Sequence, residues 1–146
     1  MNNSKKILIG SFLAMVIMVI GCIEINPTPN VPFEDKTWVL ETYGKQNNLQ
    51  PVMEGKETSA TFNSSTGKVS GSAGCNSYSA GYQKTNDRLT VTAAISTKMA
   101  CLTPKGIMQQ EMDYLNALQA TQTYQVRNNK LEIYCSDNRA LIFHAK

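Results

Sequence analysis

Histidine is almost absent from this chain, since His144 is its only one. Zinc centres and cysteine nucleophiles usually rely on histidine as a ligand or as a general base. Leu141 and Phe143 mark the inward face of a strand-like segment near the C-terminus, so His144 is expected to point outward, away from Cys75. The cysteines also lack the paired C-x-x-C spacing of zinc sites. We therefore expect no metal site, no cofactor and no Cys–His catalytic pair.

Phosphate-binding and nucleic-acid-binding patterns are missing as well. The stretch GSAGCNSYSAGY, residues 71–82, has neither the P-loop spacing nor the G-x-G-x-x-G spacing, and it leads into strand-like sequence rather than a helix. The net charge of +3 would fall to +1 if residues 1–21 were removed, and lysine and arginine form no run in the remainder. Nucleotides and nucleic acids are therefore not expected as partners.

The chain contains one long apolar run, residues 7–20, directly after Lys5 and Lys6. The run is shorter than the roughly 20 residues that a membrane helix needs, and a basic start followed by such a run is typical of an export signal. It ends in Val19-Ile20-Gly21-Cys22, which resembles the bacterial lipobox. This resemblance implies cleavage before Cys22 and lipidation of Cys22. An ordinary signal peptide or an uncleaved anchor is the alternative.

The residues around the predicted lipidation site suggest a destination and a tether. Ile23, rather than an aspartate, follows Cys22. By resemblance to lipoproteins of bacteria with two membranes, this implies anchoring to the outer membrane. In a host with one membrane, the anchor would lie on the outer face of the cytoplasmic membrane. Residues 1–21 are thus predicted to be a lipoprotein signal peptide, and the proline-containing residues 22–35 a tether or, alternatively, an irregular first strand.

Short segments rich in β-branched and aromatic residues, separated by polar turns, fill most of residues 36–146. Strands are predicted at residues 37–43, 58–63, 68–72, 88–92, 124–126, 131–135 and 140–144. The predicted fold class is α+β, a small antiparallel curled sheet or partly open barrel with one helix packed against it.

The single helix is predicted at about residues 104–120. Thr103 is placed to cap it, and Pro104 suits the first helical position. Met108, Met112 and Leu115 recur at helical spacing and predict the buried stripe. Three further apolar residues widen this stripe: Ile107, Tyr114 and Leu118. Glu111 and Asp113 are two positions apart and so lie on different faces, which argues against a catalytic acid pair.

Besides the lipidated Cys22, three cysteines remain after the predicted cleavage: Cys75, Cys101 and Cys135. Thiols of exported domains tend to form disulfides. A Cys75–Cys101 bond would close a loop of about 25 residues and contribute roughly 3–4 kcal/mol. A Cys101–Cys135 bond is the rival pairing, and either one leaves a single thiol.

Several short motifs together resemble one known family. They are Thr37-Trp38-x-Leu40, Gly74-Cys75-Asn76, Met99-Ala100-Cys101, Gln110-Glu111-x-x-Tyr114-x-x-x-Leu118, Leu131-x-Ile133 and Leu141-x-Phe143. In this order they resemble the META domain (HslJ-like) family of bacterial lipoproteins, over about residues 36–145. The resemblance implies a compact α+β envelope module with loose links to heat stress and novobiocin tolerance, and no known reaction. It also favours the Cys75–Cys101 pairing, whereas Cys135 is outside the motifs.

The function predicted from these observations is that of a lipid-anchored, non-catalytic envelope protein with a META-like domain at residues 36–146. It would bind or support another envelope component. One alternative is a tethered inhibitor or chaperone of a secreted protein, such as a cell-wall hydrolase, acting through an exposed loop at residues 44–57 or 136–139. An envelope enzyme of unknown reaction is the other. Asn76, Tyr78 and Tyr82 are the candidate binding face, unless they only fold the glycine-rich corner.

Overall fold

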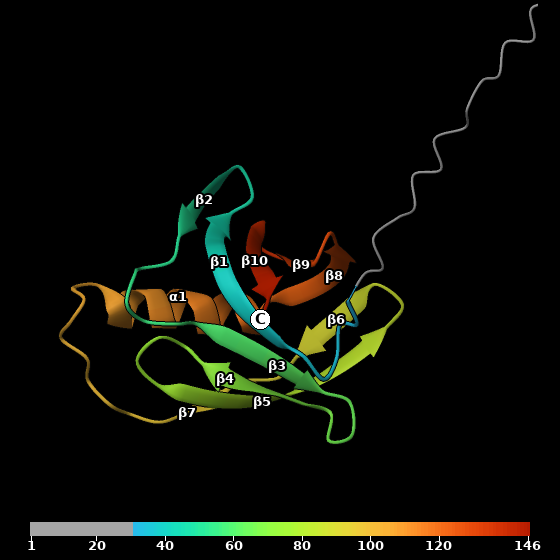
Figure 1. Ribbon diagram of the computed structural model, residues 1–146, viewed down its shortest axis with the longest axis horizontal. Coiled ribbons are helices and arrows are strands. Elements are labelled where there is room, and N and C mark those ends of the chain that lie inside the picture. The colour runs from blue at the N-terminus through green and yellow to red at the C-terminus, as the bar shows by residue number, and fades with distance from the viewer. Residues whose placement is uncertain (1–30) are drawn as a thin grey trace, which may run out of the picture.

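The computed structural model describes residues 31–146 as ten strands and one helix (Figure 1). The elements are β1 Thr37–Lys45, β2 Asn48–Pro51, β3 Ser59–Asn63, β4 Lys68–Ser72, β5 Ser77–Thr85, β6 Arg88–Val91, β7 Ile95–Ser96, α1 Ile107–Gln119, β8 Thr121–Arg127, β9 Lys130–Cys135 and β10 Arg139–Ala145. The predicted signal peptide, Cys22 and residues 22–30 of the predicted tether lie outside the described residues. Within residues 31–146, no helix has the length and apolarity needed to cross a bilayer.

The sheet is antiparallel and closes into a barrel. Eight strands form the ring, in the order β1, β3, β4, β5, β6, β8, β9 and β10. Closure depends on the length of β1, whose start pairs with β3 while most of its length pairs with β10. The predicted curled sheet with one helix is therefore right in class, but the barrel is closed rather than partly open.

The thinnest seam of the barrel lies between β6 and β8. Arg88 pairs with Thr123 there. A further backbone bond joins the Tyr124 N–H to the Asp87 carbonyl at 2.8 Å. The remaining ladders of the ring are longer, so this seam has the fewest paired residues.

The predicted strands are present with small shifts at their ends. The two-residue β7 was not predicted, and neither were two longer strands. The first of these, β5, includes residues 77–82 of the stretch that was predicted to be a glycine-rich corner. Only residues 73–76 form that corner, and Tyr78, Ala80 and Tyr82 then alternate inward along β5. The other is β2, whose side chains are all exposed, so it pairs with the end of β1 without entering the barrel wall.

The helix differs from the prediction at its start and in its buried face. It begins at Ile107 after Gly106, with no side-chain cap, so Thr103 and Pro104 precede it. Ile107, Tyr114 and Leu118 are buried as predicted. Met108 and Met112 are 39% and 52% exposed, whereas the polar Gln110 and Glu111 are buried in their place. Apolar periodicity failed here because the buried face of α1 is partly polar.

Residues 31–35 pack against the barrel. Phe33 is buried, with its ring centroid 4.4 Å from that of Phe62 and 4.3 Å from that of Tyr124. The Trp38 indole N–H donates to the Phe33 carbonyl at 2.8 Å. The packed part of the chain thus begins before residue 36, the predicted start of the domain.

Candidate functional site

Three segments that are far apart in the sequence meet at the barrel end covered by α1. They are Gly74-Cys75-Asn76 after β4, Met99-Ala100-Cys101 in the segment before α1, and Gln110-Glu111 on α1. A disulfide joins Cys75 to Cys101, with an S–S distance of 2.07 Å and a Cα–Cα distance of 5.9 Å. The pairing favoured by the resemblance is therefore present in the structure.

Asn76 links the other two segments to the corner. Its Nδ2 donates to Glu111 Oε1 at 2.8 Å and to the Met99 carbonyl at 3.1 Å. Its Oδ1 accepts from the Met99 N–H at 2.8 Å and from Thr97 Oγ1 at 2.7 Å. The Asn76 backbone N–H donates to Glu111 Oε2 at 2.7 Å, so both oxygens of the buried carboxylate have a donor. The side chain of Asn76 has used both its donors and both its acceptor positions.

Two further contacts fix α1 on the barrel. Gln110 Oε1 accepts from the Met53 N–H at 2.7 Å, and Gln110 Nε2 donates to Thr58 Oγ1 at 3.4 Å. The Tyr78 hydroxyl donates to the Ser59 carbonyl at 3.0 Å and lies 2.7 Å from the Tyr114 hydroxyl. Burial raises the pKa of both Tyr78 and Tyr114, because a phenolate there would lose its hydration.

Tyr82 lies at the other end of the barrel, among the aromatic rings. Its ring is edge-on to Phe62, with centroids 5.2 Å apart, and its hydroxyl donates to Glu34 Oε1 at 2.5 Å. Burial, followed by the hydrogen bond to Glu34, raises the pKa of Tyr82. The structure therefore does not bring Tyr82 together with Asn76 and Tyr78. All three candidate binding residues are buried and have intramolecular partners.

The residues considered for nucleophilic chemistry are also separated. Cys75 is held in the disulfide. His144 is exposed on β10, with Nδ1 3.4 Å from Glu41 Oε1. Cys135 is a buried free thiol that donates to the Ala117 carbonyl at 3.1 Å, and burial raises its pKa to about 12. Among residues 31–146, no three histidine, cysteine or acidic residues are grouped so that they could hold a metal ion.

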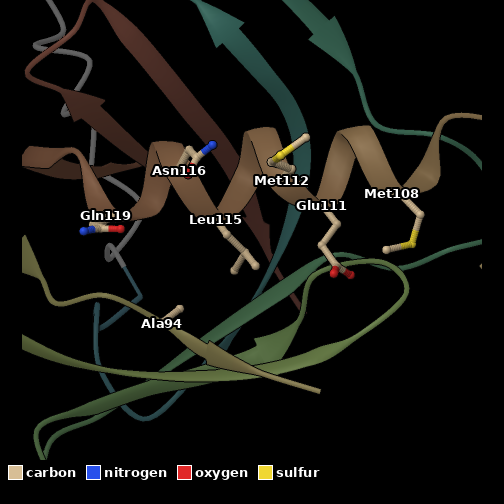
Figure 2. A pocket seen from close by; sticks show the side chains of 7 residues that line it. All are labelled: Ala94, Met108, Glu111, Met112, Leu115, Asn116 and Gln119. Atoms are coloured by element: carbon tan, nitrogen blue, oxygen red, sulfur yellow. The ribbon is translucent and has the colours of Figure 1, made fainter. Parts of the chain in front are cut away.

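The main concave feature near the motif segments is a groove of about 450 Å³ beside α1. It is lined by Ala94, Met108, Glu111, Met112, Leu115, Asn116 and Gln119. Figure 2 shows Glu111 and Leu115 pointing from the helix toward the strands, with Ala94 across the gap. Aliphatic and thioether groups supply most of the lining, and the carboxylate of Glu111 is already paired with Asn76. Such a groove suits an apolar side chain or acyl group better than an ion.

Sequence reasoning did not identify this groove. It predicted Met108 and Met112 as core residues, because their spacing matches a buried helical stripe. The only available signal was the neighbouring Gln110-Glu111 pair, two polar residues within the predicted stripe, which indicated that the helix face was not uniformly apolar.

The comparisons agree with this architecture. The META domain family model matches residues 31–146. A solution structure of a protein from Burkholderia xenovorans is 28% identical, with a TM-score of 0.65 over 84% of this chain and 92% of that one. A DUF4847 family protein from Bacteroides vulgatus shares the fold at 18% identity, with a TM-score of 0.56 over 77% of this chain and 93% of that one. No curated protein matches the chain.

Proposed function

The chain belongs to the META domain family, and from that premise we propose that it is a lipid-anchored, non-catalytic module of the bacterial envelope. In this proposal Cys22 carries the anchor and the groove beside α1 receives an apolar group of another envelope component. The module contributes to tolerance of heat or antibiotics by holding that component. The observation that carries the proposal is the groove itself, an exposed and mostly apolar surface on a helix that the Asn76 network fixes through Glu111, a residue of the groove lining.

The polar chemistry near the groove supports a binding role rather than a reaction. Both oxygens of Glu111 accept from Asn76, and Cys75 is in a disulfide. In the part of the chain that the structure describes, every buried polar side-chain atom has a partner. A catalytic acid or nucleophile needs a free lone pair or proton facing its substrate, and these groups direct theirs into the fold.

Complementation of a deletion strain tests the proposal. The wild-type gene should restore survival under heat and antibiotic stress, whereas Cys22→Ala and Met112→Glu should not. Met112 is exposed, so a glutamate there should disturb the groove without unfolding the domain. Thr66→Glu, in the exposed β3–β4 turn, is the control and should behave as wild type. Full complementation by both Cys22→Ala and Met112→Glu would overturn the proposal.

A second candidate function rests on the loops that meet at the C-terminal end of β1. The loops predicted for an inhibitor, residues 44–57 and 136–139, lie side by side, because Lys45 pairs with Arg139 and the Gln46 N–H donates to the Asn138 carbonyl at 3.0 Å. Figure 1 shows the β1–β2 hairpin projecting beyond the barrel. This projection suits insertion into the cleft of a secreted enzyme. This function would be favoured over the first if the protein inhibits a lysozyme and if that inhibition is lost when residues 46–49 are replaced by a two-residue turn.

A further inference from the structure

The short strand β7 and the loop that follows it expose an unusual set of apolar side chains. We call residues 95–105 the apolar loop. Ile95 is 82% exposed and Leu102 is 89% exposed, and Met99 lies between them at 58%. The loop is held in place by the Cys75–Cys101 disulfide and by the bonds between Met99 and Asn76. Its apolar side chains are thus presented to solvent by a fixed backbone, which costs hydrophobic free energy unless something covers them.

The charges that the apolar loop itself carries have one sign. The sequence contains no aspartate or glutamate between Asp87 and Glu111, and Lys98 and Lys105 lie within the loop. Both lysines are exposed, and neither forms an ion pair with another described residue. Met53 lies against Gly106, so the acidic Glu54 is near this end of the loop, with Lys56 beside it to offset its charge.

The loop and the start of the described chain lie at different sides of the domain. Figure 1 shows the segment between β7 and α1 at one edge of the molecule, while the described chain begins near β6 at the other. Nine chain steps separate Cys22 from Val31, and these span at most about 30 Å. A domain anchored through Cys22 therefore stays within that distance of the bilayer and can lie along it.

We propose that the apolar loop is a second membrane contact, inserting Ile95, Met99 and Leu102 into the interface of an anionic bilayer while Lys98 and Lys105 bind lipid phosphates. Aliphatic side chains flanked by lysines are the combination that binds such interfaces. The anchor at Cys22, which belongs to the proposed function, brings the bilayer within reach. The loop then holds the barrel flat on the membrane.

Vesicle binding by a chain without lipid tests this inference separately from the anchor. The protein is the mature chain, residues 22–146, with Cys22→Ala. We expect it to sediment with vesicles of phosphatidylcholine containing phosphatidylglycerol, and much less with phosphatidylcholine alone. Lys98→Glu and Lys105→Glu should each weaken binding roughly fivefold or more, since a lysine near such a surface is worth about 1 kcal/mol. Lys68→Glu, an exposed lysine on β4, should have a smaller effect.

Insertion is measured with a tryptophan placed in the loop. The emission of Leu102→Trp should shift to the blue and be quenched by brominated lipid on vesicle binding, whereas Leu49→Trp on β2 should not respond. Both positions are exposed, so both variants should fold.

Three outcomes would overturn the inference: no binding to anionic vesicles, binding unchanged in Leu102→Asp, or a crosslinker at Leu102 that captures a protein and no lipid. None of these concerns Cys22, so each would leave the anchor standing. Failure of Cys22 to incorporate labelled fatty acid would instead remove the proposed function and leave vesicle binding intact.

Discussion

At the scale of single residues, Asn76 connects the corner, the disulfide segment and α1. Asn76→Ala would leave the Met99 N–H and one oxygen of Glu111 without their partner in a buried site. An unsatisfied buried group costs about 1–3 kcal/mol, and more when it is charged. We therefore expect a loss of about 3 kcal/mol in the free energy of unfolding, measured by urea denaturation. Asn48→Ala, at an exposed position on β2, should cost less than about 0.5 kcal/mol. A similar small loss for both variants would contradict the role assigned to Asn76.

Two glycines in the same β4–β5 pair make a second residue-scale prediction. A Cβ built on Gly71 would lie 2.1 Å from the Ser59 carbonyl oxygen, a backbone atom of β3 that cannot move without disturbing the barrel. A Cβ on Gly81 would meet only the Thr92 side chain, at 3.3 Å. Gly71→Ala should therefore lower stability by about 3 kcal/mol or more, and Gly81→Ala by about 1 kcal/mol or less. Thermal unfolding followed by circular dichroism distinguishes them, and equal losses would show that β3 can yield.

At the scale of elements, the strands were the most predictable part of the fold. β3 and β6 alternate apolar and polar residues between turns, and this pattern is typical of a strand with one buried face. β5 was missed because its glycine and serines resemble a loop, while its inward residues Tyr78, Ala80 and Tyr82 differ widely in size. The sequence does not show that β1 pairs with both β3 and β10, so closure of the barrel could not be predicted without the tertiary structure.

The site was less predictable than the fold, for a physical reason. Helix α1 buries Gln110 and Glu111 because the corner supplies donors and acceptors to match them. Without the three-dimensional partner, a buried carboxylate looks unfavourable, and Met108 and Met112 look like the better core residues. The disulfide was predictable only because the resemblance favoured one of two pairings. The contact between motif segments explains why these short motifs occur together.

The disulfide should stabilise the whole α1 end of the barrel. Its two cysteines are separated by 26 residues in the chain, and they attach the segment before α1 to the corner after β4. The double variant Cys75→Ala/Cys101→Ala should lose roughly 3–4 kcal/mol by urea denaturation. The wild-type protein unfolded with a reductant present should show a comparable loss, and Cys135→Ala should not change this difference. Equal midpoints with and without reductant would contradict a stabilising role.

At the scale of the whole molecule, the barrel has two differently built ends. One end is aromatic, and there the ring of Phe33 packs against those of Phe62 and Tyr124. The other end is polar and covalently linked, and it presents the groove and the apolar loop. The covalently linked end is thus the one that carries both proposed binding surfaces, which is the arrangement expected when binding must not cost conformational entropy.

The α1 end of the barrel buries groups that must stay protonated, and this predicts how stability depends on high pH. Burial raises the pKa of Cys135 to about 12 from an ordinary value of 9.0, and it raises the pKa of Tyr78 and Tyr114 above their ordinary value of 10.0. Because the folded state holds these protons more tightly, their stabilising effect is complete below pH 9. It is lost as the pH rises from there through the folded-state values. Each group contributes a slope of up to about 1.4 kcal/mol per pH unit.

Urea denaturation of the Cys22→Ala mature chain should therefore show little change between pH 7 and pH 8.5, and a loss of several kcal/mol by pH 11. Tyr78→Phe removes one of the titrating groups, so its stability should fall less steeply with pH even though its stability at pH 8 is lower through the lost bond to Ser59. Cys135→Ala should reduce the loss in the free energy of unfolding between about pH 9 and pH 10, because the thiol is the first of these groups to ionise in the unfolded state. A midpoint that stays constant to pH 11, or slopes identical in the three proteins, would mean that these protons are released without unfolding the barrel.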